Sequence, residues 1–82
     1  MFELLRTFHW VARLGSFSKA AEHLGVSQPC VSQRMKRLEA GAGPLFDRGK
    51  LTPHGEALAR DISQMIIKLE ALEVMLCGTR SA

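Results

Sequence analysis

The sequence predicts a small, mostly α-helical domain in which three short helices precede one long helix. Apolar residues recur every three or four positions along most of the chain, which is the period of an amphipathic helix. Glycines divide the chain into segments of helical length. Its 82 residues leave room for one domain, and 46% hydrophobic with 23% charged residues is the composition of a folded chain.

The first two segments are short amphipathic helices. Residues 2–14 place their apolar side chains on one face, and Gly15 follows where a left-handed C-terminal cap would sit. The second segment begins at Ser18, which we expect to cap it, and ends at Leu24 before Gly25. Alanines on its apolar face would allow a neighbouring helix to approach closely.

The third helix is expected to present a polar, cationic face to solvent. Ser27 is its predicted N-cap, Pro29 is tolerated in the first turn, and the helix runs to about Ala40. At about 100° per residue, apolar and polar side chains separate, with Arg34 near the edge of the core. The apolar face holds Val31, Met35 and Leu38, and the outward face holds Pro29, Gln33 and Lys36, flanked by Ser32 and Arg37.

The fourth helix is predicted to start with Thr52 as cap and Pro53 as its first residue, and to run to about Leu76. Its apolar residues follow a 4-3-4-3-4 spacing, a heptad seam that one small monomer cannot cover entirely, so we expect a homodimer through this helix. Residues 45–51 before it are expected to form a very short hairpin that turns at Gly49–Lys50. The seam consists of Leu58, Ile62, Met65, Leu69, Leu72 and Leu76.

Charge is unevenly distributed along the chain. Residues 1–50 carry eight Lys or Arg against four Asp or Glu, whereas residues 51–82 carry three against four. A basic first half favours a polyanion site, although a merely solvated surface would look the same.

The sequence also predicts where the protein is located. The chain has no membrane-length apolar stretch and no signal peptide, and Cys30 and Cys77 do not make a disulfide framework. We therefore expect a cytoplasmic protein that contacts no membrane.

Residues 18–38 combine a short helix, a turn at Gly25 and a capped helix, the layout of a helix-turn-helix. The second helix of that motif enters the DNA major groove, where base edges require short polar side chains such as Gln28, Ser32 and Gln33. An ordinary three-helix bundle with polar residues facing water is the alternative. The cations available for phosphates are Lys19, Arg34, Lys36, Arg37, Arg48 and Lys50.

Other chemistries find little support. The histidines and cysteines lack metal-ligand spacing, so we expect neither a metal nor a cofactor. No nucleophile and base can be paired, which argues against an enzyme. Trp10 is expected to pack its helix rather than to stack on a base. Cys30 lies in the first turn of a helix, where a redox switch and a merely tolerated small residue are both open.

The segment GSFSKAAEHLGVSQPCVS at residues 15–32 is a specific motif, and it is followed by Leu45-Phe46-Asp47-Arg48 and Leu51-Thr52-Pro53-His54-Gly55. With these residues the chain resembles the N-terminal winged helix-turn-helix of LysR-type transcriptional regulators. The resemblance implies a three-helix core, a very short wing and a long C-terminal linker helix. It divides the chain into a DNA-binding domain at residues 1–55 and a linker and dimerisation helix with its tail at residues 56–82.

The resemblance also implies roles for individual residues. It places Gln28, Pro29, Ser32 and Gln33 against bases. Many family members have Arg before Gln after that serine, so the order Gln33-Arg34 suggests a different preferred base. Because the wing between Arg48 and Leu51 is only two residues long, phosphate contacts are expected there rather than minor-groove contacts. The expected phosphate contacts are Ser18, Lys19, Ser27, Arg34, Lys36, Arg37, Arg48 and Lys50.

The implied function is sequence-specific double-stranded DNA binding by a bacterial transcription regulator, as a homodimer on an interrupted palindrome. The resemblance further implies an effector-sensing domain beyond residue 82, and without it we expect DNA binding that does not respond to a small molecule. A winged-helix adaptor that binds protein and an architectural binder without sequence preference are the alternatives, and a small enzyme lacks a visible constellation.

Overall fold

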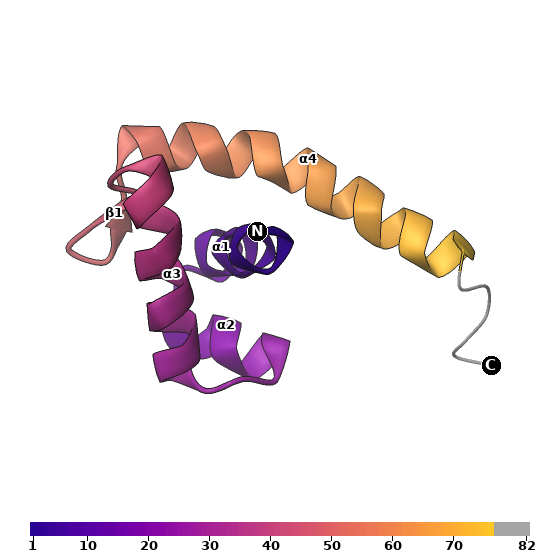
Figure 1. Cartoon of the computed structure of the whole chain (residues 1–82), viewed down its shortest axis with the longest axis horizontal. Helices are drawn as coiled ribbons and strands as arrows, with labels where there is room; N and C mark the ends of the chain where they lie inside the picture. The colour runs from indigo at the N-terminus through magenta and orange to yellow at the C-terminus, as the bar shows by residue number, and fades with distance from the viewer. Residues whose placement is uncertain (77–82) are drawn as a thin grey trace.

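The computed structural model describes residues 1–76 and has the expected mostly helical architecture (Figure 1). Three helices form the body of the domain, a two-stranded wing follows, and a long helix crosses the body and continues past it. Cys77 lies outside the described residues. The elements are α1 (Phe2–Leu14), α2 (Phe17–Leu24), α3 (Gln28–Ala42), β1 (Phe46–Asp47), β2 (Lys50–Leu51) and α4 (Pro53–Leu76).

The helix caps agree with the sequence prediction except at the start of α2. Ser27 caps α3 as predicted, accepting a hydrogen bond from the backbone N–H of Cys30 at 3.3 Å. The cap of α2 is Ser16 rather than Ser18, because Ser16 has extended backbone and accepts from the N–H of Lys19 at 3.1 Å. Ser18 already lies inside the helix, so its hydroxyl is available for another partner. Gly25 ends α2 with φ of 72°, a conformation that favours glycine.

The core lies where α1 meets α2, α3 and α4. Phe8 of α1 is fully buried at its centre. Trp10 stacks at a tilt on His23 of α2, with ring centroids 3.9 Å apart, so its body packs helices together as predicted. Leu24 is only half-buried and the alanines carry the apolar face of α2. The buried cluster comprises Phe8, Val11, Ala20, Ala21, Val31, Met35, Leu38, Leu45, Ile62 and Ile66.

The wing is a two-stranded antiparallel ribbon in which Phe46 pairs with Leu51. Its turn is Arg48–Gly49, so the predicted turn at Gly49–Lys50 is wrong by one residue. Both turn residues have positive φ, as a two-residue hairpin turn requires. The apolar pair decides the register: the ring of Phe46 packs edge-on against Phe8 at 5.7 Å, and a one-residue shift would turn it away from the core.

A carboxylate at the end of α3 holds the start of the wing. One oxygen of Glu39 accepts hydrogen bonds from the backbone N–H groups of Leu45 at 2.7 Å and Phe46 at 3.0 Å. A ring nitrogen of His54 lies 2.7 Å from the carbonyl oxygen of Ala42, which joins the same helix end to α4. The wing is therefore positioned relative to α3 by side chains on both of its flanks.

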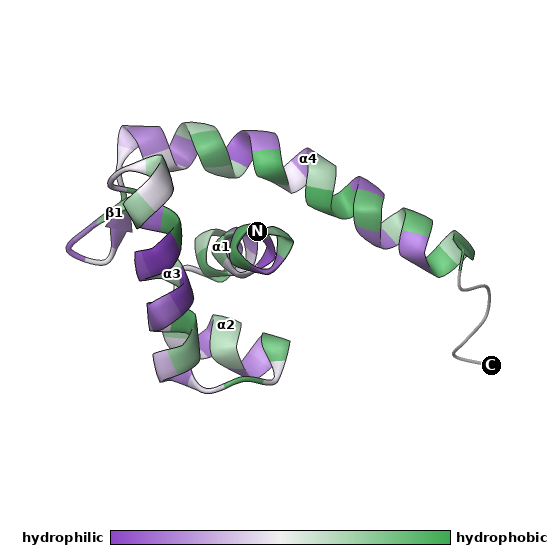
Figure 2. Ribbon diagram, in the orientation of Figure 1, coloured by the Kyte–Doolittle hydropathy of each residue, from purple (hydrophilic) through white to green (hydrophobic). Residues whose placement is uncertain are grey.

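Helix α4 begins in the domain and ends outside it. The Thr52 hydroxyl accepts from the N–H of Gly55 and donates to the carbonyl of Pro44, both at 3.0 Å, which confirms the predicted cap. Ile62 and Ile66 are buried against the body, whereas the last turns extend past α2 and α3, lie near the start of α1 and carry exposed hydrophobic residues (Figures 1 and 2). In the part of the chain that the structure describes, no helix has the length and apolarity to cross a membrane.

The six residues of the predicted heptad seam therefore divide into two parts, one packed in the domain and one exposed. Ile62 is buried in the core of its own domain and Leu58 packs beside it, so both residues pack within the single chain. The other four seam residues remain exposed, with Met65 at 60%, Leu69 at 44%, Leu72 at 49% and Leu76 at 83%. Exposed apolar side chains in such a continuous row are typical of a surface that binds a partner.

Candidate nucleic-acid interface

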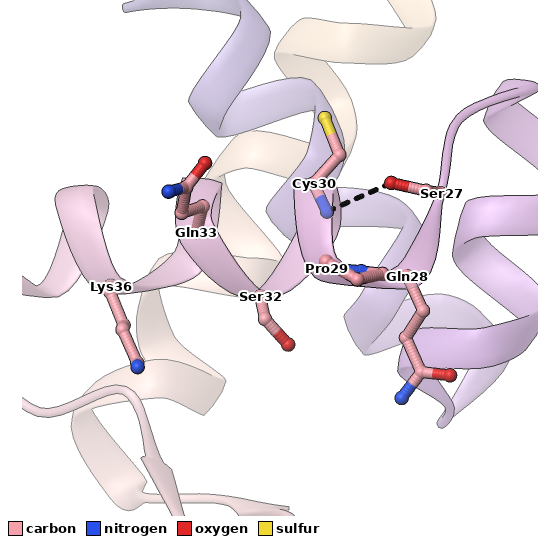
Figure 3. Close-up of a pocket in the computed structure, with 7 residues that line it drawn as sticks. All are labelled: Ser27, Gln28, Pro29, Cys30, Ser32, Gln33 and Lys36. Carbon is pink, nitrogen blue, oxygen red and sulfur yellow. Dashed lines mark hydrogen bonds between the residues drawn. The ribbon is translucent and has the colours of Figure 1, made fainter.

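The outward face of α3 forms a shallow hollow that contains all four predicted base-contact residues. Gln28, Ser32 and Lys36 leave one side of the helix, and Cys30 and Gln33 leave the other (Figure 3). No acidic side chain lies in the lining, so nothing there would repel a polyanion. The lining residues are Ser27, Gln28, Pro29, Cys30, Ser32, Gln33 and Lys36.

Packing on the opposite side of α3 explains why this face is free. Val31, Met35 and Leu38 are buried against the other helices, with 0%, 2% and 4% exposure. Because these residues repeat every three or four positions, the polar residues on the opposite side of the helix are directed outward. The Ser27 oxygen accepts the capping bond, which leaves its hydroxyl proton free to donate to an external acceptor such as a phosphate.

A side-chain hydrogen bond spans the turn between α2 and α3. The hydroxyl of Ser18 donates to Oε1 of Gln28 at 3.0 Å. The sequence predicts a phosphate contact for Ser18 and does not reveal this pair, since nothing in the local pattern relates two polar residues on either side of a turn. Only the turn at Gly25, which brings the start of α3 back beside α2, places the two side chains together.

Arg34 does not join the other predicted phosphate contacts. Its Nη1 donates to the Thr7 hydroxyl at 3.1 Å and lies 4.0 Å from a carboxylate oxygen of Glu3. Only 23% of its side chain is exposed. Arg34 therefore links α3 to α1, and its charge is partly balanced within the domain. The helical wheel placed it near the core edge, but the spacing carried no sign of the partner on α1.

The remaining predicted phosphate-binding cations are exposed and come from three elements. Lys19 belongs to the first turn of α2, and the others belong to α3 and to the wing. Within residues 1–76, none of them forms a salt bridge with an acidic side chain. Their charges are thus available to an external anion. These cations are Lys19, Lys36, Arg37, Arg48 and Lys50.

The described part of the chain contains no cluster of three or more His, Cys, Asp or Glu residues that could hold a metal ion. His9 of α1 is buried, and this burial lowers the pKa of its imidazole. The Glu70 carboxylate acts in the opposite direction, and the charge of Arg13 adds to the lowering. A neutral imidazole near pH 7 fits a packing role for His9. Cys30 is half-buried at the edge of the hollow.

Comparison with known proteins identifies the family. The model of the "Bacterial regulatory helix-turn-helix protein, lysR family" matches residues 2–56. The chain belongs to the LysR family. It is similar to the HTH-type transcriptional regulator YtlI of Bacillus subtilis, with 44% identity over 73 residues, and to the regulator BudR of Klebsiella aerogenes, with 44% identity over 72 residues. These matches cover 84% and 82% of this chain, but only 24% of YtlI and 50% of BudR.

Solved structures of LysR-family proteins share the fold. The DNA-binding domain of BenM, in its complex with catB site 1 DNA, superposes with a TM-score of 0.83 at 29% identity, covering 100% of this chain and 98% of that one. The OxyR C206S mutant of Corynebacterium glutamicum superposes with a TM-score of 0.87 at 32% identity, covering 98% of this chain and 27% of OxyR. The predicted winged helix-turn-helix is confirmed.

Proposed function

We propose that this LysR-family chain binds double-stranded DNA sequence-specifically as part of a bacterial transcription regulator in the cytoplasm. The observation that carries the proposal is the exposed N-terminal half of α3, which presents hydrogen-bonding side chains and no acid. An α-helix of this kind fits the major groove with its N-terminal residues against base edges. The similarity to a domain solved in complex with DNA supports the same conclusion. We assign no catalytic role, metal or cofactor.

The proposed contacts divide into base readers and phosphate anchors. Gln28, Pro29, Ser32 and Gln33 lie together on the exposed face and are proposed to contact bases. Arg34 is omitted from the anchors because Thr7 and Glu3 already hold it. Phosphate contacts fix register and orientation but carry little sequence information. The proposed anchors are Lys19, Ser27, Lys36, Arg37, Arg48 and Lys50.

We further propose that two chains associate through α4. An apolar groove runs between the start of α1 and the last turns of α4, and the end of α4 from a second copy would cover it. The DNA-binding unit would then comprise residues 1–55 together with the buried first half of α4, and the exposed half would form the dimer contact. Two recognition helices related by a dyad require an interrupted palindrome. The groove is lined by Phe2, Arg6, Leu69, Glu70, Leu72, Glu73 and Leu76.

Selection of bound sites from a random duplex pool tests the proposal, using the wild type and Gln28→Ala. The wild type should return a dyad-symmetric consensus, and Gln28→Ala should lose about 1–3 kcal/mol of discrimination at one position of each half-site. Gln64→Ala is the matched control, because Gln64 is an exposed glutamine on α4 away from the interface. Its consensus should be unchanged.

The salt dependence of binding separates DNA recognition from the adaptor alternative. The logarithm of the affinity for the selected duplex should fall with the logarithm of salt concentration by about 0.9 per phosphate contacted. An adaptor that binds protein would yield no consensus and no such dependence, whereas an architectural binder would keep the dependence without a consensus. Either result would refute sequence-specific recognition.

A further inference from the structure

The hydrogen bond between Ser18 and Gln28 determines which end of the Gln28 amide faces away from the protein. Ser18 lies in the first turn of α2 and Gln28 is the first residue of α3. The amide oxygen of Gln28 accepts the Ser18 hydroxyl at 3.0 Å. In Figure 3 the Gln28 side chain extends to the side of α3 that also carries Ser32 and Lys36. With its oxygen engaged by α2, the amide offers its NH₂ group to that side.

The orientation of this amide matters because glutamine can recognise bases in two ways. A freely rotating glutamine pairs with adenine by two bonds, in which the amide oxygen accepts from N6 and the amide nitrogen donates to N7. A glutamine that presents only its NH₂ group instead matches edges made of acceptors. Guanine offers N7 and O6 as acceptors in the major groove, and thymine offers O4.

We propose that Ser18 is a positioning residue that determines base specificity through Gln28. By holding the amide oxygen it makes Gln28 a hydrogen-bond donor, which selects guanine or thymine over adenine at the contacted position. The inference rests on the proposed function, since it requires Gln28 to contact a base. It assigns to Ser18 a role different from the phosphate contact that the sequence suggested.

The test measures base preference at the base pair of the consensus where Gln28→Ala removes the preference for particular bases. Competition binding on duplexes that differ only at that base pair compares the wild type, Ser18→Ala, Ser18→Thr and the Ser18→Ala/Gln28→Ala double variant. The wild type should favour guanine or thymine over adenine about fivefold or more. Ser18→Thr keeps the hydroxyl and should keep the preference. Ser18→Ala should lose it or reverse it toward adenine, and should change nothing further once Gln28 is alanine.

The Ser18→Ala variant should fold, because alanine is favoured inside a helix and the cap of α2 is Ser16. Circular dichroism checks that it does. The proposal is overturned if the wild type prefers adenine or if Ser18→Ala keeps the wild-type preference. It is also overturned if Ser18→Ala lowers the affinity for all duplexes equally, even when residue 28 is already alanine. The last result is the behaviour of a phosphate contact. If Gln28→Ala flattens no position, the proposed role of Gln28 fails, and the role of Ser18 fails with it.

Discussion

Replacing Gly55 by alanine is expected to unfold the domain or to separate the wing from α4. A Cβ atom at this position would overlap the backbone carbonyl oxygen of Leu45 and would also crowd the Leu51 side chain at 3.1 Å. The carbonyl cannot move aside easily, because it accepts a hydrogen bond from the N–H of Thr52 at 3.0 Å. The backbone N–H of Leu45 also donates a hydrogen bond to Glu39, and the Leu45 side chain is fully buried.

The expected loss of unfolding free energy for Gly55→Ala lies at or above the upper end of the ~1–3 kcal/mol typical of overpacking. A loss of that size is a large part of the stability of a small domain. Denaturant unfolding followed by circular dichroism measures it. Gly41→Ala is the matched control: Gly41 lies in α3, and an added Cβ would meet nothing within 4 Å.

Gly41→Ala should leave the stability unchanged or raise it by roughly 0.5–1 kcal/mol, since alanine is the better helix former. If the two alanine variants unfolded at the same denaturant concentration, the close packing of α4 on the residue before the wing would be disproved. The comparison isolates the local contact, because both variants introduce the same chemical group.

Placing glutamate at both Leu69 and Leu72 is expected to yield monomers and to lower the affinity for the selected operator by about 10²-fold or more. Both leucines line the groove between α1 and α4 and are about half exposed in the single chain. Two buried carboxylates at a dimer contact would carry a large desolvation cost. Loss of the second recognition helix removes the gain from simultaneous binding at two half-sites, which is commonly 10²–10⁴-fold.

Sedimentation measures the oligomeric state, and a competition assay measures the affinity. The charge-matched control is Gln64→Glu with Ala71→Glu, which adds two carboxylates at exposed positions of the same helix off the heptad seam. That control should remain dimeric. The leucines are outside the buried core, so the helical content of the first variant should be retained. If the variant with both leucine substitutions were still dimeric, the proposal that a second copy covers this groove would be wrong.

Interactions within one element were predictable from the sequence. The spacing of Val31, Met35 and Leu38 already determined which face of α3 is turned to the core, and therefore that Pro29, Gln33 and Lys36 are exposed. The same local logic applies to the cap at Ser27 and to the start of α4 at Thr52. These features depend on helix geometry and on hydrogen bonds over three or four residues, so the sequence contains all the information they require.

Features that depend on contacts between distant elements were decided by the tertiary structure. The register of the wing follows from the contact of Phe46 with Phe8, and Arg34 is held by Thr7, 27 residues earlier in the chain. The heptad spacing of α4 indicated an apolar seam but did not reveal that its first half, including Ile62, is covered by the domain itself. Periodicity reports that a face is apolar; which surface covers that face is set by three-dimensional packing, because residues far apart in sequence supply it.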